Sequence, residues 1–183
     1  MIGAEWLLPL LGVYLVTILI RVVRGLPRTA RRRQATTSTL FLYALSVAAI
    51  TVFPIHRRSP DYWAGEPWWT VIHWIPFVVD APSFVLNIVM FVPFGVLVPL
   101  LWHRFDSWRR LAGCAVAASA TIELTQFVLG VTLGSRRTVD INDLISNTAG
   151  ALLGLLMLRL AVPHAVHRAR IAAATAVRAA PTR

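Results

Sequence analysis

The sequence predicts an all-α membrane protein, a polytopic bundle of about five transmembrane helices, and three observations support this. The 183 residues are 57% hydrophobic and only 14% charged, whereas soluble domains carry about 25% charged residues. The apolar residues gather in blocks near the roughly 20 residues that a helix needs to cross ~30 Å of hydrocarbon. The chain has a formal net charge of +10 and no lysine. Its arginines gather at the ends of the apolar blocks.

The apolar blocks cover about residues 2–23, 39–55, 83–102, 110–129 and 141–162. The first block is longer than the apolar region of a signal peptide and has no basic segment before it, so we expect it to remain as a helix. The second is the shortest, and we expect its end at Phe53-Pro54 to lie among headgroups. We therefore expect one transmembrane domain, residues 1–162, followed by a basic, solvated cytoplasmic tail, residues 163–183.

The distribution of arginine predicts the orientation of the chain. Arginines are most frequent in the first and third connections and in the tail, and sparser in the second and fourth connections, which have only Arg57, Arg58, Arg136 and Arg137. Cytoplasmic loops carry the excess of basic residues. We therefore expect the amino terminus outside and the carboxyl terminus in the cytoplasm. A basic chain is also typical of nucleic-acid-binding proteins, but this placement fits lipid headgroups, and we expect no nucleic-acid partner.

Polar side chains in the last three blocks predict a functional site. Charged groups inside a membrane are costly and usually face a partner, a cavity or a site. In the predicted orientation, six such residues fall in the outer third of the bilayer: Asn87, Glu123, Gln126, Asp140, Asp143 and Asn147. The last three are three and four residues apart, so they share one face of a helix. We expect these groups to meet in one pocket.

Two features of the fifth block bear on this prediction. Asp140 and Asp143 also suit the capping of a helix amino terminus, which is the structural interpretation of both. Gly150 and Gly154 form a small-xxx-small pattern that allows close helix packing. We expect the fifth helix to pack on the third and fourth with its carboxylates turned inward.

The second connection, residues 56–82, is rich in tryptophan and contains His56 and His73. Tryptophan prefers the membrane interface, so the segment is expected either as an interfacial belt or as a lid over the polar pocket. The two histidines are weak candidates as ligands. The single cysteine, Cys114, lies in an apolar block, and no internal disulfide is expected.

Three motifs resemble those of VanZ-like membrane proteins. They are N-I-V-M-F-V-P-F-G at 87–95, E-L-T-Q at 123–126, and the R-x-x-D-x-x-D-x-x-x-N-x-x-G pattern that begins at Arg137 and ends at Gly150. I-P-F at 75–77 also fits, so the resemblance covers about residues 74–154. It implies a multi-pass protein of the bacterial cytoplasmic membrane in a family whose founding member is associated with teicoplanin resistance. It does not imply a settled mechanism.

Three functions are open from these residues. As a binding protein without catalytic activity, it would bind an envelope lipid, a peptidoglycan precursor or a lipoglycopeptide through Asn87, Gln126, Arg137 and Asn147. As an enzyme on a lipid headgroup, it would use Glu123 as a general base with Asp140 and Asp143, which are also the candidate ligands of a divalent cation. As a structural scaffold, it would pair Glu123 with Arg137. The oligomeric state is not predicted.

Overall fold

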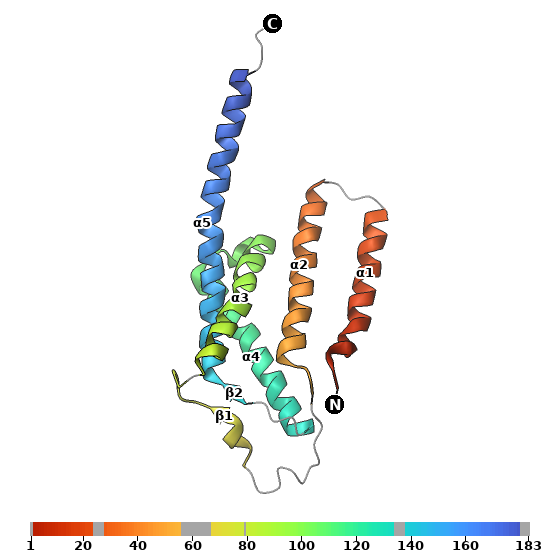
Figure 1. Ribbon diagram of the computed structural model, residues 1–183, viewed down its shortest axis with the longest axis vertical. Helices are drawn as coiled ribbons and strands as arrows, with labels where there is room; N and C mark the ends of the chain where they lie inside the picture. The colour runs from red at the N-terminus through yellow and green to blue at the C-terminus, as the bar shows by residue number, and fades with distance from the viewer. Residues whose placement is uncertain (1, 24–27, 56–66, 79, 134–137, 180–183) are drawn as a thin grey trace.

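Five long helices contain most of the residues that the structure describes (Figure 1). The computed structural model describes residues 2–23, 28–55, 67–78, 80–133 and 138–179. The helices are α1 (Leu8–Val23), α2 (Arg28–Thr51), α3 (Ala81–Leu101), α4 (Trp108–Leu133) and α5 (Ile141–Ala179). Shorter elements are the 3₁₀ helices η1 (Ala4–Leu7), η3 (Trp68–Val71) and η4 (His103–Phe105) and the strands β1 (Ile72–His73) and β2 (Val139–Asp140). The predicted all-α fold class is confirmed.

Four segments among the described residues are long and apolar enough to cross a membrane: Ala4–Arg21, Ala81–Leu101, Trp108–Leu133 and Ile141–Ala161. Helix α2 is not among them. Arg28 and Arg31–Arg33 lie in its first turns, and the segment that follows them begins with the mostly polar run Q-A-T-T-S-T. The expected span at 39–55 is thus the apolar half of a longer helix, which ends at Thr51. Helix α5 continues as a helix to Ala179, into the segment expected as a tail. The amino terminus and the end of α5 lie at opposite ends of the molecule (Figure 1).

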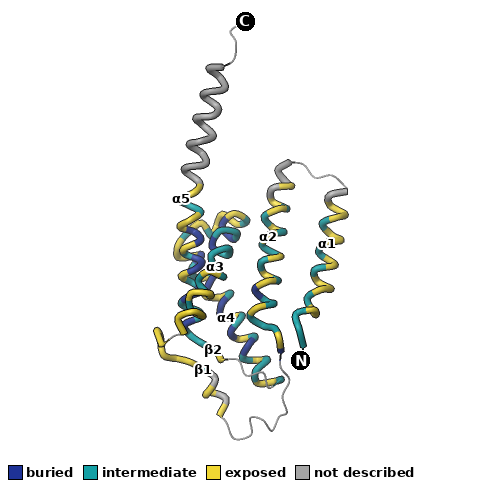
Figure 2. The backbone as a smooth tube through the Cα atoms, in the orientation of Figure 1, coloured by how far each residue is buried: buried dark blue, intermediate teal, exposed yellow. Residues whose placement is uncertain are grey.

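The buried core lies among α3, α4 and α5 (Figure 2). Two apolar clusters form it, one of Phe91, Ala115 and Ala151 and one of Val98, Leu111 and Leu155. None of the described residues of α1 is buried. Helix α1 contacts α2 through the stacked rings of Tyr14 and Phe41, whose centroids are 3.9 Å apart. The three-helix core therefore supplies the rigid frame of the molecule.

Glycines let α5 approach α3 closely. A Cβ atom at Gly150 would run into the carbonyl oxygen of Ile88, and one at Gly154 would run into that of Val92. Both clashes are with backbone, which cannot move aside as a flexible side chain can. The small-xxx-small prediction is confirmed, as is the packing of α5 on α3 and α4. This contact fixes the rotation of α5, and with it the direction of the polar residues in its first turns.

Candidate functional site

The amino terminus of α5 is capped by Asp140. The Oδ1 atom of Asp140 accepts hydrogen bonds from the backbone N–H and the side-chain Nδ2 of Asn142, both at 2.8 Å. The capping interpretation of Asp140 therefore holds. The residue also has a second contact, because its own N–H donates to Glu123 Oε2 at 3.2 Å. The start of α5 is thus tied to the middle of α4.

Asn142 fastens the segment 72–78 to the start of α5. Its Oδ1 accepts from the N–H of Phe77 at 2.7 Å, and its Nδ2 donates to the carbonyl oxygens of Ile75 at 3.2 Å and Val78 at 3.4 Å. Phe77 has φ 65, a left-handed conformation that is strained for a bulky side chain. The parallel pairing of β1 with β2 holds the same segment. Asn142 is 2% exposed, so the clamp is internal.

Asn142 is not among the residues that the sequence predicts for the site. Its side chain forms hydrogen bonds with a loop that lies more than 60 positions earlier in the chain. No local sequence spacing predicts such a contact. The one available signal is a short amide side chain in the first turn of a helix, where side chains can reach neighbouring backbone groups.

Glu123 and Asp143 place two carboxyl groups in contact between α4 and α5. Glu123 is 5% exposed, and Asn87 Nδ2 donates to Asp143 Oδ1 at 2.6 Å. At the same end of the bundle, His73 Nδ1 lies 3.6 Å from Asp140 Oδ2. Two carboxylates in contact repel each other unless they share a proton or a cation. The pair is thus suited to share a proton or to hold a cation.

A first cavity at this end, the amide-lined cavity, has a volume of about 470 Å³. Its polar lining is Thr51, Ser83, Asn87, Glu123, Gln126, Asp143 and Asn147, and its apolar lining is Ile50, Leu86, Val89, Met90 and Ile122. Gln126 Nε2 donates to the carbonyl oxygen of Thr51 at 2.7 Å, and Asn147 Nδ2 donates to Ser119 Oγ at 2.9 Å. Asn147 Oδ1 is buried and has no partner within the described part of the chain. Such a group costs about 1–3 kcal/mol.

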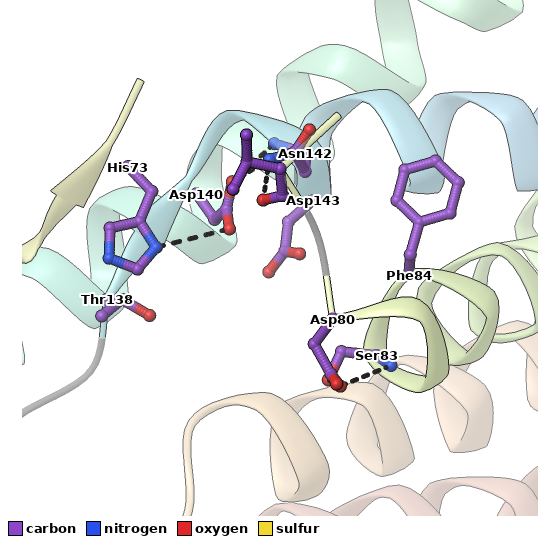
Figure 3. A pocket seen from close by; sticks show the side chains of 9 residues that line it. His73, Asp80, Ser83, Phe84, Thr138, Asp140, Asn142 and Asp143 are labelled. Carbon is purple, nitrogen blue, oxygen red and sulfur yellow. Dashed lines mark hydrogen bonds and ion pairs between the residues drawn. The ribbon is translucent and has the colours of Figure 1, made fainter. Parts of the chain in front are cut away.

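The second cavity, the His73 cavity, has a volume of about 450 Å³ (Figure 3). Its polar lining is His73, Asp80, Ser83, Thr138, Asp140, Asn142 and Asp143. Asp80 caps α3 by accepting from the N–H of Ser83 at 3.1 Å and from its Oγ at 2.8 Å. Figure 3 shows the carboxylate of Asp143 pointing into the space between His73 and Asp80. Asp143 and Ser83 line both cavities, which therefore adjoin each other.

The structure brings together six of the seven residues predicted for the site. Five of them line the amide-lined cavity: Asn87, Glu123, Gln126, Asp143 and Asn147. Asp140 lines the His73 cavity instead. Arg137 lies outside the described residues, as does His56. Within the described part of the chain, no group of three or more His, Cys, Asp or Glu side chains is placed to hold a metal ion. The catalytic and metal-binding roles of Asp140 and Asp143 stay predictions.

Comparison with known proteins assigns the family. A family model described as VanZ/LLP1 matches residues 11–162. The chain is also 28% identical over 127 residues to Protein VanZ of Enterococcus faecium, an alignment that covers 68% of each chain. No solved structure matches the chain significantly. The matched region includes most of α1 and all of α2. The motifs that carry the resemblance in the sequence do not extend to these two helices, which share only their hydrophobicity with the family. The chain therefore belongs to the VanZ/LLP1 family.

Proposed function

We propose that this chain is a bacterial envelope protein that binds an amphiphile, with the head group in the amide-lined cavity and the apolar chain along α2 and α3. One observation carries the proposal: a single cavity combines buried polar groups with exposed apolar side chains. Ile50, Leu86 and Val89 on its rim are 69%, 66% and 60% exposed. A lipid-facing rim of this kind suits a hydrocarbon chain.

The energetics support a binding site over a purely structural cluster. A polar residue in a transmembrane bundle is stabilised when its hydrogen bonds are made within the protein. Here Asn147 Oδ1, which has no partner among the described residues, leaves the cluster incomplete. Ligand sites combine a mostly apolar lining with a few convergent polar groups. The amide-lined cavity has this composition.

The ligand class follows from the proposed location. With the amino terminus outside, the cavity lies in the outer part of the membrane, where exported lipids present their head groups. An envelope lipid, a lipid-linked peptidoglycan precursor and a lipoglycopeptide each join a polar head to an apolar chain. We propose that capture of such a molecule links the chain to glycopeptide resistance, including resistance to teicoplanin.

Lipid retention tests the proposal. Purified protein in detergent would be examined by native mass spectrometry for amphiphiles that remain bound. We expect Asn147→Leu to lose them, because leucine removes polar groups from the cavity. The control is Thr121→Leu, which changes an exposed residue whose hydroxyl donates only to Ala117 of its own helix. Equal retention by both variants would contradict the proposal.

A second candidate is hydrolysis or transfer of a lipid head group, favoured by the contact between Glu123 and Asp143. Two carboxyl groups in one site are able to divide the roles of proton donor and proton acceptor. If this holds, Glu123→Gln abolishes turnover of radiolabelled envelope lipids while the protein stays folded and retains bound amphiphile. Unchanged turnover would exclude Glu123 from that role.

A further inference from the structure

We propose that residues 74–78, called the apolar loop below, insert into the membrane interface at the end of the core that contains Glu123 and Asp143. The partner of this surface is then lipid, at the boundary between head groups and acyl chains. The proposal does not depend on the proposed function. Three features carry it: the exposure of the loop's apolar side chains, the pairing of its backbone groups within the protein, and its position beside two helices that are long and apolar enough to span a membrane.

The apolar loop carries large side chains that the protein leaves uncovered. Trp74, Ile75, Phe77 and Val78 are 66%, 66%, 75% and 69% exposed. No charged side chain occurs from residue 74 to residue 79. Contiguous exposed apolar side chains mark a surface that meets a partner or a membrane, and tryptophan is enriched where a membrane meets water. The surface therefore fits an apolar environment better than water.

The backbone of the apolar loop is paired in a way that suits an apolar environment. The side chain of Asn142 accepts from the N–H of Phe77 and donates to the carbonyl oxygens of Ile75 and Val78. Pro76 has no N–H that needs a partner. A loop in water can take its partners from the solvent, whereas an unpaired backbone group near hydrocarbon is costly. The same bonds hold the loop in one shape, so insertion costs little further conformational freedom.

The apolar loop lies beside the starts of α3 and α5 (Figure 1). Asn142, which holds it, is in the first turn of α5. Both helices contain segments that are long and apolar enough to cross a membrane, and the start of such a segment lies at the level of the head groups. The apolar surface also continues onto α3: Val78 and Phe84 line the same cavity, and the next residues, Val85 and Leu86, are 55% and 66% exposed.

The sequence also allowed a lid over the polar pocket, and the structure favours the interface instead. Of the five loop residues, all of which the structure describes, Val78 lines the His73 cavity and none lines the amide-lined cavity. The three bonds from Asn142 oppose the movement that closure would need. The apolar side chains are thus presented to the surroundings of the bundle.

Site-directed spin labelling tests the proposal. Cys114 is the only cysteine of the chain, so a Cys114→Ala background allows one nitroxide to be attached at Ile75→Cys or at Phe77→Cys in the full-length protein. The label would be studied by EPR in vesicles of phosphatidylethanolamine and phosphatidylglycerol. Its accessibility to O₂, which concentrates in lipid, would be compared with its accessibility to Ni-EDDA, which stays in water.

Two reference positions calibrate the measurement. Val85→Cys lies at an exposed apolar position of α3, and Arg109→Cys lies at an exposed charged position of α4. We expect the ratio of O₂ to Ni-EDDA accessibility at Ile75→Cys and Phe77→Cys to approach that of Val85→Cys, and to exceed that of Arg109→Cys by about threefold or more.

A measurement without labels keeps the test decisive if a cysteine variant does not fold. Trp74→Phe keeps an aromatic ring and removes one of seven tryptophans, so the fluorescence difference between wild type and this variant reports on Trp74. We expect lipid that is brominated close to the head group to quench this difference. Iodide in the water should quench it about threefold less than it quenches free tryptophan, because the ring lies in the interface.

Other outcomes would overturn the proposal and identify what covers the apolar loop. Labels as accessible to Ni-EDDA as Arg109→Cys, together with quenching of Trp74 by iodide, would place the loop in water. Labels that neither reagent reaches would show that protein covers them. Dipolar broadening that disappears on dilution with unlabelled protein would then assign the covering surface to a second copy of the chain, and its absence would assign the loop to a lid.

Discussion

The two ends of the α3–α4–α5 core differ in how their charged side chains are paired. At one end, Arg159 donates through Nε and Nη2 to Asp106 Oδ1 at 3.1 and 2.9 Å, and its guanidinium lies 4.9 Å from the centre of the Trp108 ring. Both charged side chains there are more than one-third exposed. At the other end, Glu123 and Asp143 are carboxyl groups in contact, and Glu123 is buried.

This difference separates a charge with a structural role from the carboxyl pair that is proposed to be functional. The Arg159–Asp106 pair has both signs, and Arg159 also donates to the carbonyl oxygen of Asp106 at 3.1 Å. This pair, called the latch below, links the residue that follows η4 to α5. The carboxyl pair has one sign and lies beside an unpartnered amide oxygen. An arrangement that costs stability is commonly found where a protein binds or reacts.

The largest expected effect on stability comes from a substitution at the contact between α3 and α5, which belongs to the core that joins the two ends. Gly150→Val would push side-chain carbons into the carbonyl of Ile88, and we expect it to cost about 3 kcal/mol, lowering the yield of folded protein and its melting temperature. Gly113→Val is the control, because nothing lies within 4 Å of a Cβ at that position. Similar melting temperatures for the two variants would show that α3 and α5 are not packed as described.

A smaller effect is expected from the clamp at the polar end. Asn142→Leu removes both the acceptor of the Phe77 N–H and the donor to Ile75 and Val78, and we expect it to cost about 2 kcal/mol. Hydrogen exchange at the Phe77 amide should accelerate. Asn142→Asp keeps the acceptor and should give an intermediate rate. An unchanged rate in Asn142→Leu would mean that the pairing of β1 with β2 suffices to hold the segment.

The carboxyl pair should respond with the opposite sign. Asp143→Asn removes one of two carboxyl groups in contact and keeps an oxygen that can accept from Asn87. We expect it to raise the stability of the ligand-free protein by about 1 kcal/mol, since like-charge repulsion is relieved. The same variant should lose bound amphiphile. A fall in ligand-free melting temperature would remove the contrast between the two ends.

The smallest expected effect is at the latch. Arg159→Met should lower stability by about 0.5–1 kcal/mol and leave amphiphile retention unchanged. Arg109→Met, at an exposed position on α4, serves as the control. High salt should narrow the difference between wild type and Arg159→Met, because exposed pairs are screened. Loss of bound amphiphile in Arg159→Met would show that the two ends are coupled.

Much of the site is predictable because its residues follow helical spacing. Glu123 and Gln126 share one face of α4, and the stripe on α5 joins its polar residues to Gly150 and Gly154. These patterns depend only on helical geometry. The clamp by Asn142 is not predictable in this way, because its partners belong to a loop whose path depends on the folded core. The extent of α2 is also missed, since its arginine-rich first turns are helical without being apolar.

Asp143 and Ser83 line both cavities, so a molecule that enters from the His73 side meets the Asp143 carboxylate on its way to the amide-lined cavity. A molecule that enters from the bilayer first meets the exposed apolar side chains of Leu86 and Val89. The two routes therefore differ in the chemistry that an incoming molecule contacts first.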